Sequence, residues 1–90
     1  MIKIKCYIRR NCDACKIMLR IITDVITDIN IDCAIRVINV ENLSIDEKAE
    51  LNINKFPLTI IEKDDNNKAT LKGTYPIEFI ENVILNIEKA

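Results

Sequence analysis

The chain has 90 residues, a net charge of −1 and four cysteines. That length fits one domain, 1–90, able to bury roughly 60 % of the surface that its unfolded chain exposes. Acidic and basic residues are spread along the sequence, which gives no electrostatic signature of nucleic-acid or anionic-membrane binding. No apolar run reaches signal-peptide or membrane-spanning length. We therefore expect a cytoplasmic protein that contacts neither a membrane nor a nucleic acid, and we expect it to be a monomer. In that reducing compartment the four cysteines are not expected to form a structural disulfide framework.

The first half of the chain predicts two strands joined by a helix. Residues 2–8 alternate apolar and polar side chains, which is the period of a strand. Asn11 can cap a helix. The apolar positions of that helix recur at helical spacing and are Met18, Ile21, Ile22, Val25 and Ile29. Residues 33–40, CAIRVINV, are apolar at nearly every position and rich in β-branched side chains, as in a strand covered on both faces. A helical connection between two such strands implies a parallel, right-handed crossover.

The second half predicts a short helix, a hairpin and a closing helix. An S-x-x-E capping box opens a helix over residues 44–51. Residues 57–63, PLTIIEK, and 68–72, KATLK, flank a DDNN turn and should pair antiparallel. Pro76 suits the first position of the last helix. The buried face of that helix is expected to hold Ile77, Ile80, Val83, Ile84 and Ile87. The predicted order is βαβ-α-ββα, an α/β fold with a four-stranded mixed sheet flanked by three helices.

Two cysteines, Cys12 and Cys15, lie in the first turn of the first predicted helix. That turn offers unpaired N–H groups and a partial positive charge, which stabilise the nucleophilic thiolate. Cys15, one turn further on, can attack a mixed disulfide formed at Cys12 and close an intramolecular disulfide. We predict Cys12 as the attacking thiol and Cys15 as the resolving thiol. The charged neighbours in RRNCDACK further predict an exposed, reactive pair.

The other two cysteines, Cys6 and Cys33, lie within strand patterns and are predicted to be small core residues. The usual zinc site needs two close cysteine pairs or histidines, and this chain has one close pair and no histidine. No metal ligands are therefore predicted.

A strand leading into C-x-x-C at a helix start, followed later by a proline opening a strand, resembles the thioredoxin/glutaredoxin superfamily over essentially the whole chain. The segment LNINKFPLTIIEK, residues 51–63, is similar to the stretch in which that superfamily places a proline at the entry to its third strand. The resemblance implies a thioredoxin-like fold and a cis Pro57 that faces the cysteine pair. It also implies that Phe56 supplies backbone hydrogen bonds to a bound substrate chain. Arg10 and Asn11, directly before Cys12, complete the expected substrate-binding residues.

The resemblance implies a small dithiol–disulfide oxidoreductase that serves electron transport and reduces protein or glutathione mixed disulfides. Its partners would be a disulfide-containing protein and either a reductase or glutathione; no bound cofactor is expected, and glutathione is a candidate reductant. The chain has C-D-A-C and Lys55-Phe56-Pro57 where typical glutaredoxins carry C-P-Y-C and Thr-Val-Pro, so the choice of reductant stays open. Arg9 and Arg10 could bind a glutathione carboxylate or an acidic partner surface, or simply be solvated. The alternative functions are metal or iron–sulfur cluster binding and a non-catalytic partner-binding module of the same fold.

Overall fold

The computed structural model describes all residues, 1–90, and confirms the predicted order of elements. In chain order these are β1 (Ile2–Ile8), α1 (Asp13–Asp28), β2 (Cys33–Asn39), the 3₁₀ helix η1 (Val40–Asn42), α2 (Ile45–Leu51), β3 (Leu58–Asp64), β4 (Asn67–Lys72) and α3 (Ile77–Lys89). Only η1 was not anticipated. The fold is therefore the predicted four-stranded sheet with three α-helices.

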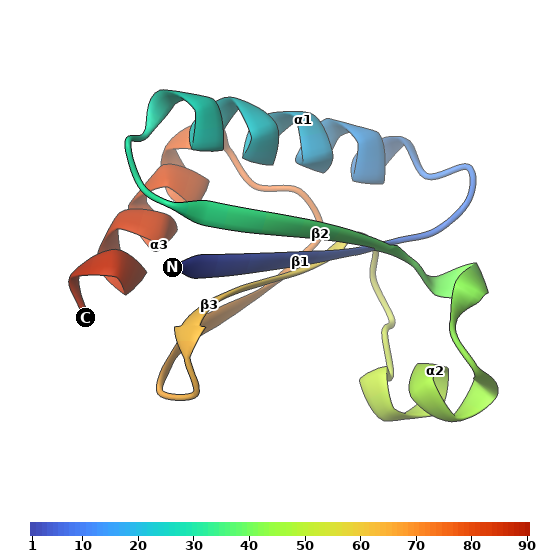
Figure 1. Cartoon of the computed structure of the whole chain (residues 1–90). Coiled ribbons are helices and arrows are strands. Elements are labelled where there is room, and N and C mark those ends of the chain that lie inside the picture. Colours follow the sequence, from blue (N-terminus) through green and yellow to red (C-terminus); the bar gives the residue numbers. More distant parts are fainter.

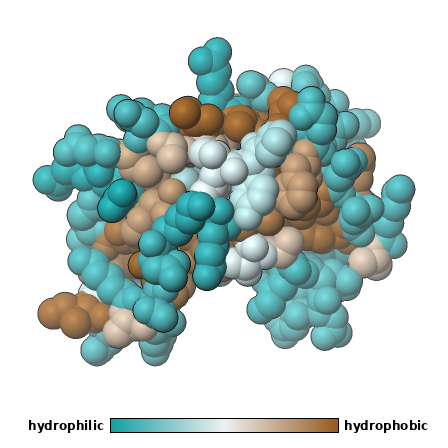
Figure 2. Space-filling view, turned by 180° about the vertical axis from the view of Figure 1, so that it is seen from behind, coloured by the Kyte–Doolittle hydropathy of each residue, from teal (hydrophilic) through white to brown (hydrophobic).

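The sheet has the strand order β2-β1-β3-β4. β1 and β2 are parallel, whereas the β1–β3 and β3–β4 pairs are antiparallel. Helices α1 and α3 pack against each other on one face, and α2 lies on the other side of the sheet, near the end of β2 (Figure 1). Seen from behind, hydrophilic side chains surround smaller areas of apolar surface (Figure 2). With α1 and α3 on one face and only the short α2 on the other, much of the second face of the sheet has no helical cover.

The hydrophobic core lies between the sheet and the pair α1 and α3. Successive residues of a strand point to opposite faces, so every second residue of β1 enters this core. Its buried members are Ile2, Ile4, Cys6, Met18, Ile22, Val25, Ile61, Leu71, Ile80, Ile84 and Ile87. Full burial of one such aliphatic side chain contributes roughly 1.5–3 kcal/mol. The predicted helical apolar faces are thus the ones that build the core, with Ile21, Ile29, Ile77 and Val83 only partly buried at its margin.

The prediction that residues 33–40 are covered on both faces is wrong. β2 is the edge strand of the sheet and pairs only with β1. Ile35 and Val37 are 41 % and 47 % exposed, and η1 takes over at Val40. A run of β-branched residues reports a preference for extended backbone, whereas the position of a strand within a sheet is set by tertiary pairing.

Two helices begin one residue later than predicted. Asn11 has a φ of 55°, in the left-handed region, whereas an N-cap residue adopts extended backbone. Cys12, with φ −115° and ψ 101°, is the N-cap of α1 instead. Pro76 likewise precedes α3 as its N-cap, with a ψ of 153°, rather than opening it.

The short helix α2 begins at the predicted capping box. The Glu47 N–H donates to the Ser44 Oγ and the Ser44 N–H donates to the Glu47 Oε1, both across 3.1 Å. The helix buries none of its own residues, and Ile45 is 85 % exposed. None of the helices combines the length and the apolar character that crossing a membrane requires.

Candidate functional site

The cysteine pair lies where β1 leads into α1. Cys12 caps the helix, Cys15 lies in its first turn, and the two are joined by a disulfide with their Cα atoms 5.2 Å apart. The backbone N–H of Cys15 donates to the Sγ of Cys12 across 3.1 Å. The Cys12 sulfur thus lies at the positive end of the α1 dipole, where a thiolate is stabilised when the disulfide is reduced.

The pair is less exposed than the sequence predicted. Cys12 is 7 % exposed and Cys15 only 2 %, although Asn11, Asp13 and Lys16 around them are exposed. The prediction of an exposed pair is therefore wrong. The charged side chains around the pair are themselves solvated, but the two cysteines beside them are buried. Cys12 is the more accessible of the two.

The loop that precedes Cys12 is fixed from outside by Glu41. The backbone N–H of Arg10 donates to the Oε1 of Glu41 across 2.6 Å. That hydrogen bond holds the pKa of the Glu41 carboxyl below its usual range. The Glu41 N–H in turn donates to the Asn39 Oδ1 across 3.0 Å. Sequence reasoning missed Glu41, because nothing in its local pattern reveals a partner 31 residues away.

Phe56 and Pro57 lie beside the same loop. Strand pairing places Tyr7 opposite Leu58, so the end of β1 and the start of β3 adjoin. The Phe56–Pro57 peptide bond is cis, as the resemblance implied. The Arg9 guanidinium lies over the Phe56 ring, 5.2 Å from its centroid. The structure thus brings Arg9, in the loop that leads to Cys12, into contact with Phe56, the residue before the cis proline.

Gly73 adds a third backbone segment next to Pro57. Its N–H donates to the Pro57 carbonyl oxygen across 2.8 Å. Its φ of 89° is rarely adopted by other residues, and a Cβ at this position would lie 3.0 Å from the Lys55 Cε. The glycine therefore lets the turn after β4 close over Pro57 while the Lys55 side chain passes alongside.

A pocket of about 190 Å³ opens next to Phe56. It is lined by Val40, Lys48, Ile53 and Phe56, and three of these four residues are apolar. A pocket of this kind next to the cis proline offers space for an apolar side chain of a bound segment.

The remaining cysteines are not part of this site. Cys6 is fully buried, as predicted, and accepts a hydrogen bond from the Thr59 Oγ1 across 3.7 Å. Burial raises the pKa of its thiol. Cys33 is half-buried against the core, and burial together with the Glu88 and Asp32 carboxylates raises its pKa as well. The chain gathers no group of three or more histidine, cysteine, aspartate or glutamate side chains that could hold a metal ion.

No family model matches the chain, and no curated protein is similar to it in sequence. Solved structures are similar in fold. Chloroplastic thioredoxin z superimposes with a TM-score of 0.86 at 21 % identity, over 100 % of this chain and 80 % of that one. Thioredoxin-2 of a malaria parasite gives 0.76 at 11 % identity, over 100 % and 84 %.

Schistosoma mansoni thioredoxin gives a TM-score of 0.73 at 18 % identity, over 96 % of this chain and 78 % of that one. At these low identities the similarity shows the fold alone. The disulfide-bonded cysteine pair at the start of α1 adds support for a redox thiol protein. The chain therefore has the fold of the thioredoxin/glutaredoxin superfamily, here as a four-stranded sheet with three helices.

Proposed function

We propose that this protein is a small dithiol–disulfide oxidoreductase. The observation that carries the proposal is the placement of Cys12 at the N-terminus of α1, where it is disulfide-bonded to Cys15. A helix N-terminus supplies the N–H groups that favour a thiolate, and a second thiol within bonding distance supplies the resolving step.

The reaction starts from the reduced pair. The Cys12 thiolate attacks one sulfur of a substrate disulfide, forms a Cys12–substrate mixed disulfide and expels the other substrate sulfur as a thiolate. Cys15, losing its proton to solvent, then attacks the Cys12 sulfur and releases the second substrate thiolate. Two electrons have passed from the protein dithiol to the substrate, and the protein is left in the disulfide form that the structure shows.

A substrate chain would bind beside Phe56 and the loop of residues 9–12. Phe56 would offer its backbone N–H and carbonyl groups to an extended segment, while Arg10 and Asn11 would contact it from the other side. Support comes from the Arg9 guanidinium over the Phe56 ring, which links this loop to Phe56. In this proposal the protein works in the cytoplasm as a monomer, with a disulfide-containing protein as substrate.

The test is reduction of insulin disulfides by the purified protein, with dithiothreitol as the electron source. Wild type should accelerate precipitation of the insulin B chain, and Cys12→Ser should abolish that acceleration. Cys33→Ser is the matched control, since it removes a thiol outside the site, and it should retain the activity. Equal activity of wild type and Cys12→Ser would rule the proposal out.

The natural reductant can be determined with the same assay. Dithiothreitol is replaced in one arm by glutathione with glutathione reductase, and in the other by thioredoxin reductase, each with NADPH. Faster NADPH consumption in the first arm would assign a glutaredoxin-like role, and in the second a thioredoxin-like role. Absorbance of anaerobically purified protein tests the competing function, because a bound iron–sulfur cluster would be coloured.

A further inference from the structure

The sheet face opposite α1 and α3 is strongly basic. Successive residues of a strand point to opposite faces of the sheet. The strand residues that alternate with the buried core residues therefore point to this open face, and the register places them side by side on neighbouring strands. The charged ones are Lys3, Lys5, Arg36, Glu62, Lys68 and Lys72. The even spread of charge along the sequence therefore does not persist in the folded protein.

The separation of charge on this face is large. It holds five of the thirteen basic residues of the chain but only one of the fourteen acidic ones, in a protein with a net charge of −1. Lys3, Arg36, Lys68 and Lys72 are all exposed. Lys5 is the only one of the five with a carboxylate within ion-pair distance, the Glu62 Oε1 at 3.8 Å. The other four cations are free to meet an external anion.

The cations form a regular array because they lie on paired strands. Lys5 lies beside Arg36 across the β1–β2 pair, about 4.8 Å away along the sheet. Lys3 and Lys68 lie on either side of Glu62 in the row formed by β1, β3 and β4. Residues two apart on one strand, such as Lys3 and Lys5, are separated by roughly 6.7 Å. Carboxylates three or four residues apart on a helix have a similar spacing of about 5–6 Å.

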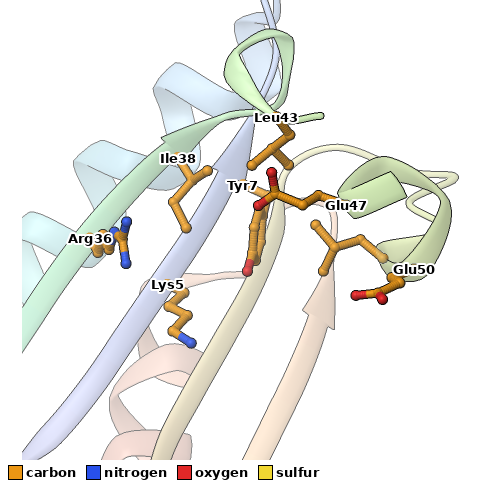
Figure 3. A pocket seen from close by; sticks show the side chains of 8 residues that line it. Lys5, Tyr7, Arg36, Ile38, Leu43, Glu47 and Glu50 are labelled. Carbon is orange, nitrogen blue, oxygen red and sulfur yellow. The ribbon is translucent and has the colours of Figure 1, made fainter. Parts of the chain in front are cut away.

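Two hollows lie on this face. The larger, about 380 Å³, is lined among others by Lys3, Lys5, Arg36 and Glu62. The smaller, about 270 Å³, lies between the sheet and α2, with Lys5 and Arg36 on the sheet side and Glu47 and Glu50 on the helix side (Figure 3). Glu47 is already engaged in the capping box of α2. The acidic wall is therefore confined to the α2 end, and the rest of the face remains basic.

We propose that this basic face binds an acidic segment of a partner protein, as a docking surface separate from the cysteine pair. A protein segment fits better than a nucleic acid. Tyr7 is the only aromatic residue on the face and is 8 % exposed, so no ring is available for base stacking. Apolar residues adjoin the cations and can pack against the apolar side chains of a peptide: Ala34 lies opposite Lys3, Ile60 lies opposite Lys5, and Ile38 follows Arg36 by two residues on β2.

The test measures the binding of a fluorescein-labelled helical peptide of Glu-Glu-Ala-Leu repeats, by fluorescence anisotropy at low and at physiological ionic strength. Lys3→Glu/Lys68→Glu reverses two exposed cations of the face that make no hydrogen bond or ion pair in the structure. Arg20→Glu/Lys89→Glu, on α1 and α3, is the matched control with the same change in net charge. We expect the first variant to bind roughly tenfold more weakly, since two attractions become repulsions, and the control to bind nearly as well as wild type.

Equal weakening in both variants would overturn the proposal, because it would assign binding to net charge alone, and so would an absence of wild-type binding. A thymidine oligonucleotide of the same charge that binds more tightly than the peptide would overturn it in favour of a nucleic acid. Amide chemical-shift mapping on the wild-type protein gives an independent answer. Shifts confined to residues 3–5, 36 and 68–72 support the proposal, and shifts around Cys12 contradict it. Insulin reduction is a separate readout that this proposal does not move.

Discussion

The backbone N–H of Arg10 donates to the Oε1 of Glu41 across 2.6 Å, although 31 residues separate the two. The bond ties the loop that leads into Cys12 to η1, the 3₁₀ helix that follows β2. A hydrogen bond that a carboxylate accepts from a backbone N–H is charge-assisted and is stronger than a bond between two neutral groups. The approach to the cysteine pair is therefore held by a residue outside the C-x-x-C segment.

Glu41→Gln should lower stability at neutral pH and not at acid pH. The Arg10 N–H lowers the pKa of the Glu41 carboxyl in the folded protein, so the stabilisation is fully present above the unfolded pKa of about 4.3. It is lost as the pH falls through the lowered value. Urea unfolding at pH 7 and near pH 2 should show a gap between wild type and variant that closes in acid. A gap of the same size at both pH values would contradict this role for Glu41.

The four cysteines should react with iodoacetamide in a fixed order once the protein is reduced. Cys12 should be labelled first at neutral pH, because it lies at the helix N-terminus and is more accessible than Cys15. Cys6 should be labelled last, since it is fully buried and burial raises its pKa. Peptide mass analysis over time gives the order, with the urea-unfolded protein as the control in which the differences disappear. Labelling of Cys6 ahead of Cys12 would contradict the role of Cys12 as the attacking thiol.

The sequence predicted every α-helix and strand because its local signals agree with its fold. The alternation over Ile2–Ile8 and the Ser44 capping box each specify an element without tertiary help. The place of β2 at the sheet edge could not be predicted, since it follows from long-range pairing. The Arg10–Glu41 bond and the basic face likewise depend on residues that only folding brings together. The cysteine pair was found because its chemistry lies within one short segment.

Arg9→Ala should destabilise the protein slightly, and Arg10→Ala less. The Arg9 guanidinium lies 5.2 Å from the centroid of the Phe56 ring, a cation–π contact worth about 0.5–1 kcal/mol at exposed sites. Arg10 contributes its backbone N–H, which the substitution keeps. Chemical unfolding of both variants gives the comparison. An Arg10→Ala variant as unstable as Arg9→Ala, or more so, would show that the contact with Phe56 is not what stabilises this region.

Ile84→Ala should cost far more stability than Ile45→Ala. Ile84 is fully buried between α3 and the sheet, so truncation leaves a cavity, at a cost of about 2–5 kcal/mol. Ile45 is 85 % exposed on α2, and its truncation should change the free energy of unfolding by less than about 0.5 kcal/mol. Urea denaturation measures both. A large loss for Ile45→Ala would mean that α2 packs on a surface that this fold does not show.

In the proposed function, Cys12 and Cys15 form a redox couple that cycles between dithiol and disulfide. The direct measurement equilibrates the protein in glutathione buffers of known ratio, traps free thiols and locates them by mass analysis. We predict a reversible two-electron transition confined to residues 12 and 15, present in Cys33→Ser and absent in Cys12→Ser. Its midpoint would show whether the protein donates electrons or withdraws them. A pair that forms no disulfide at any glutathione ratio would contradict the oxidoreductase assignment.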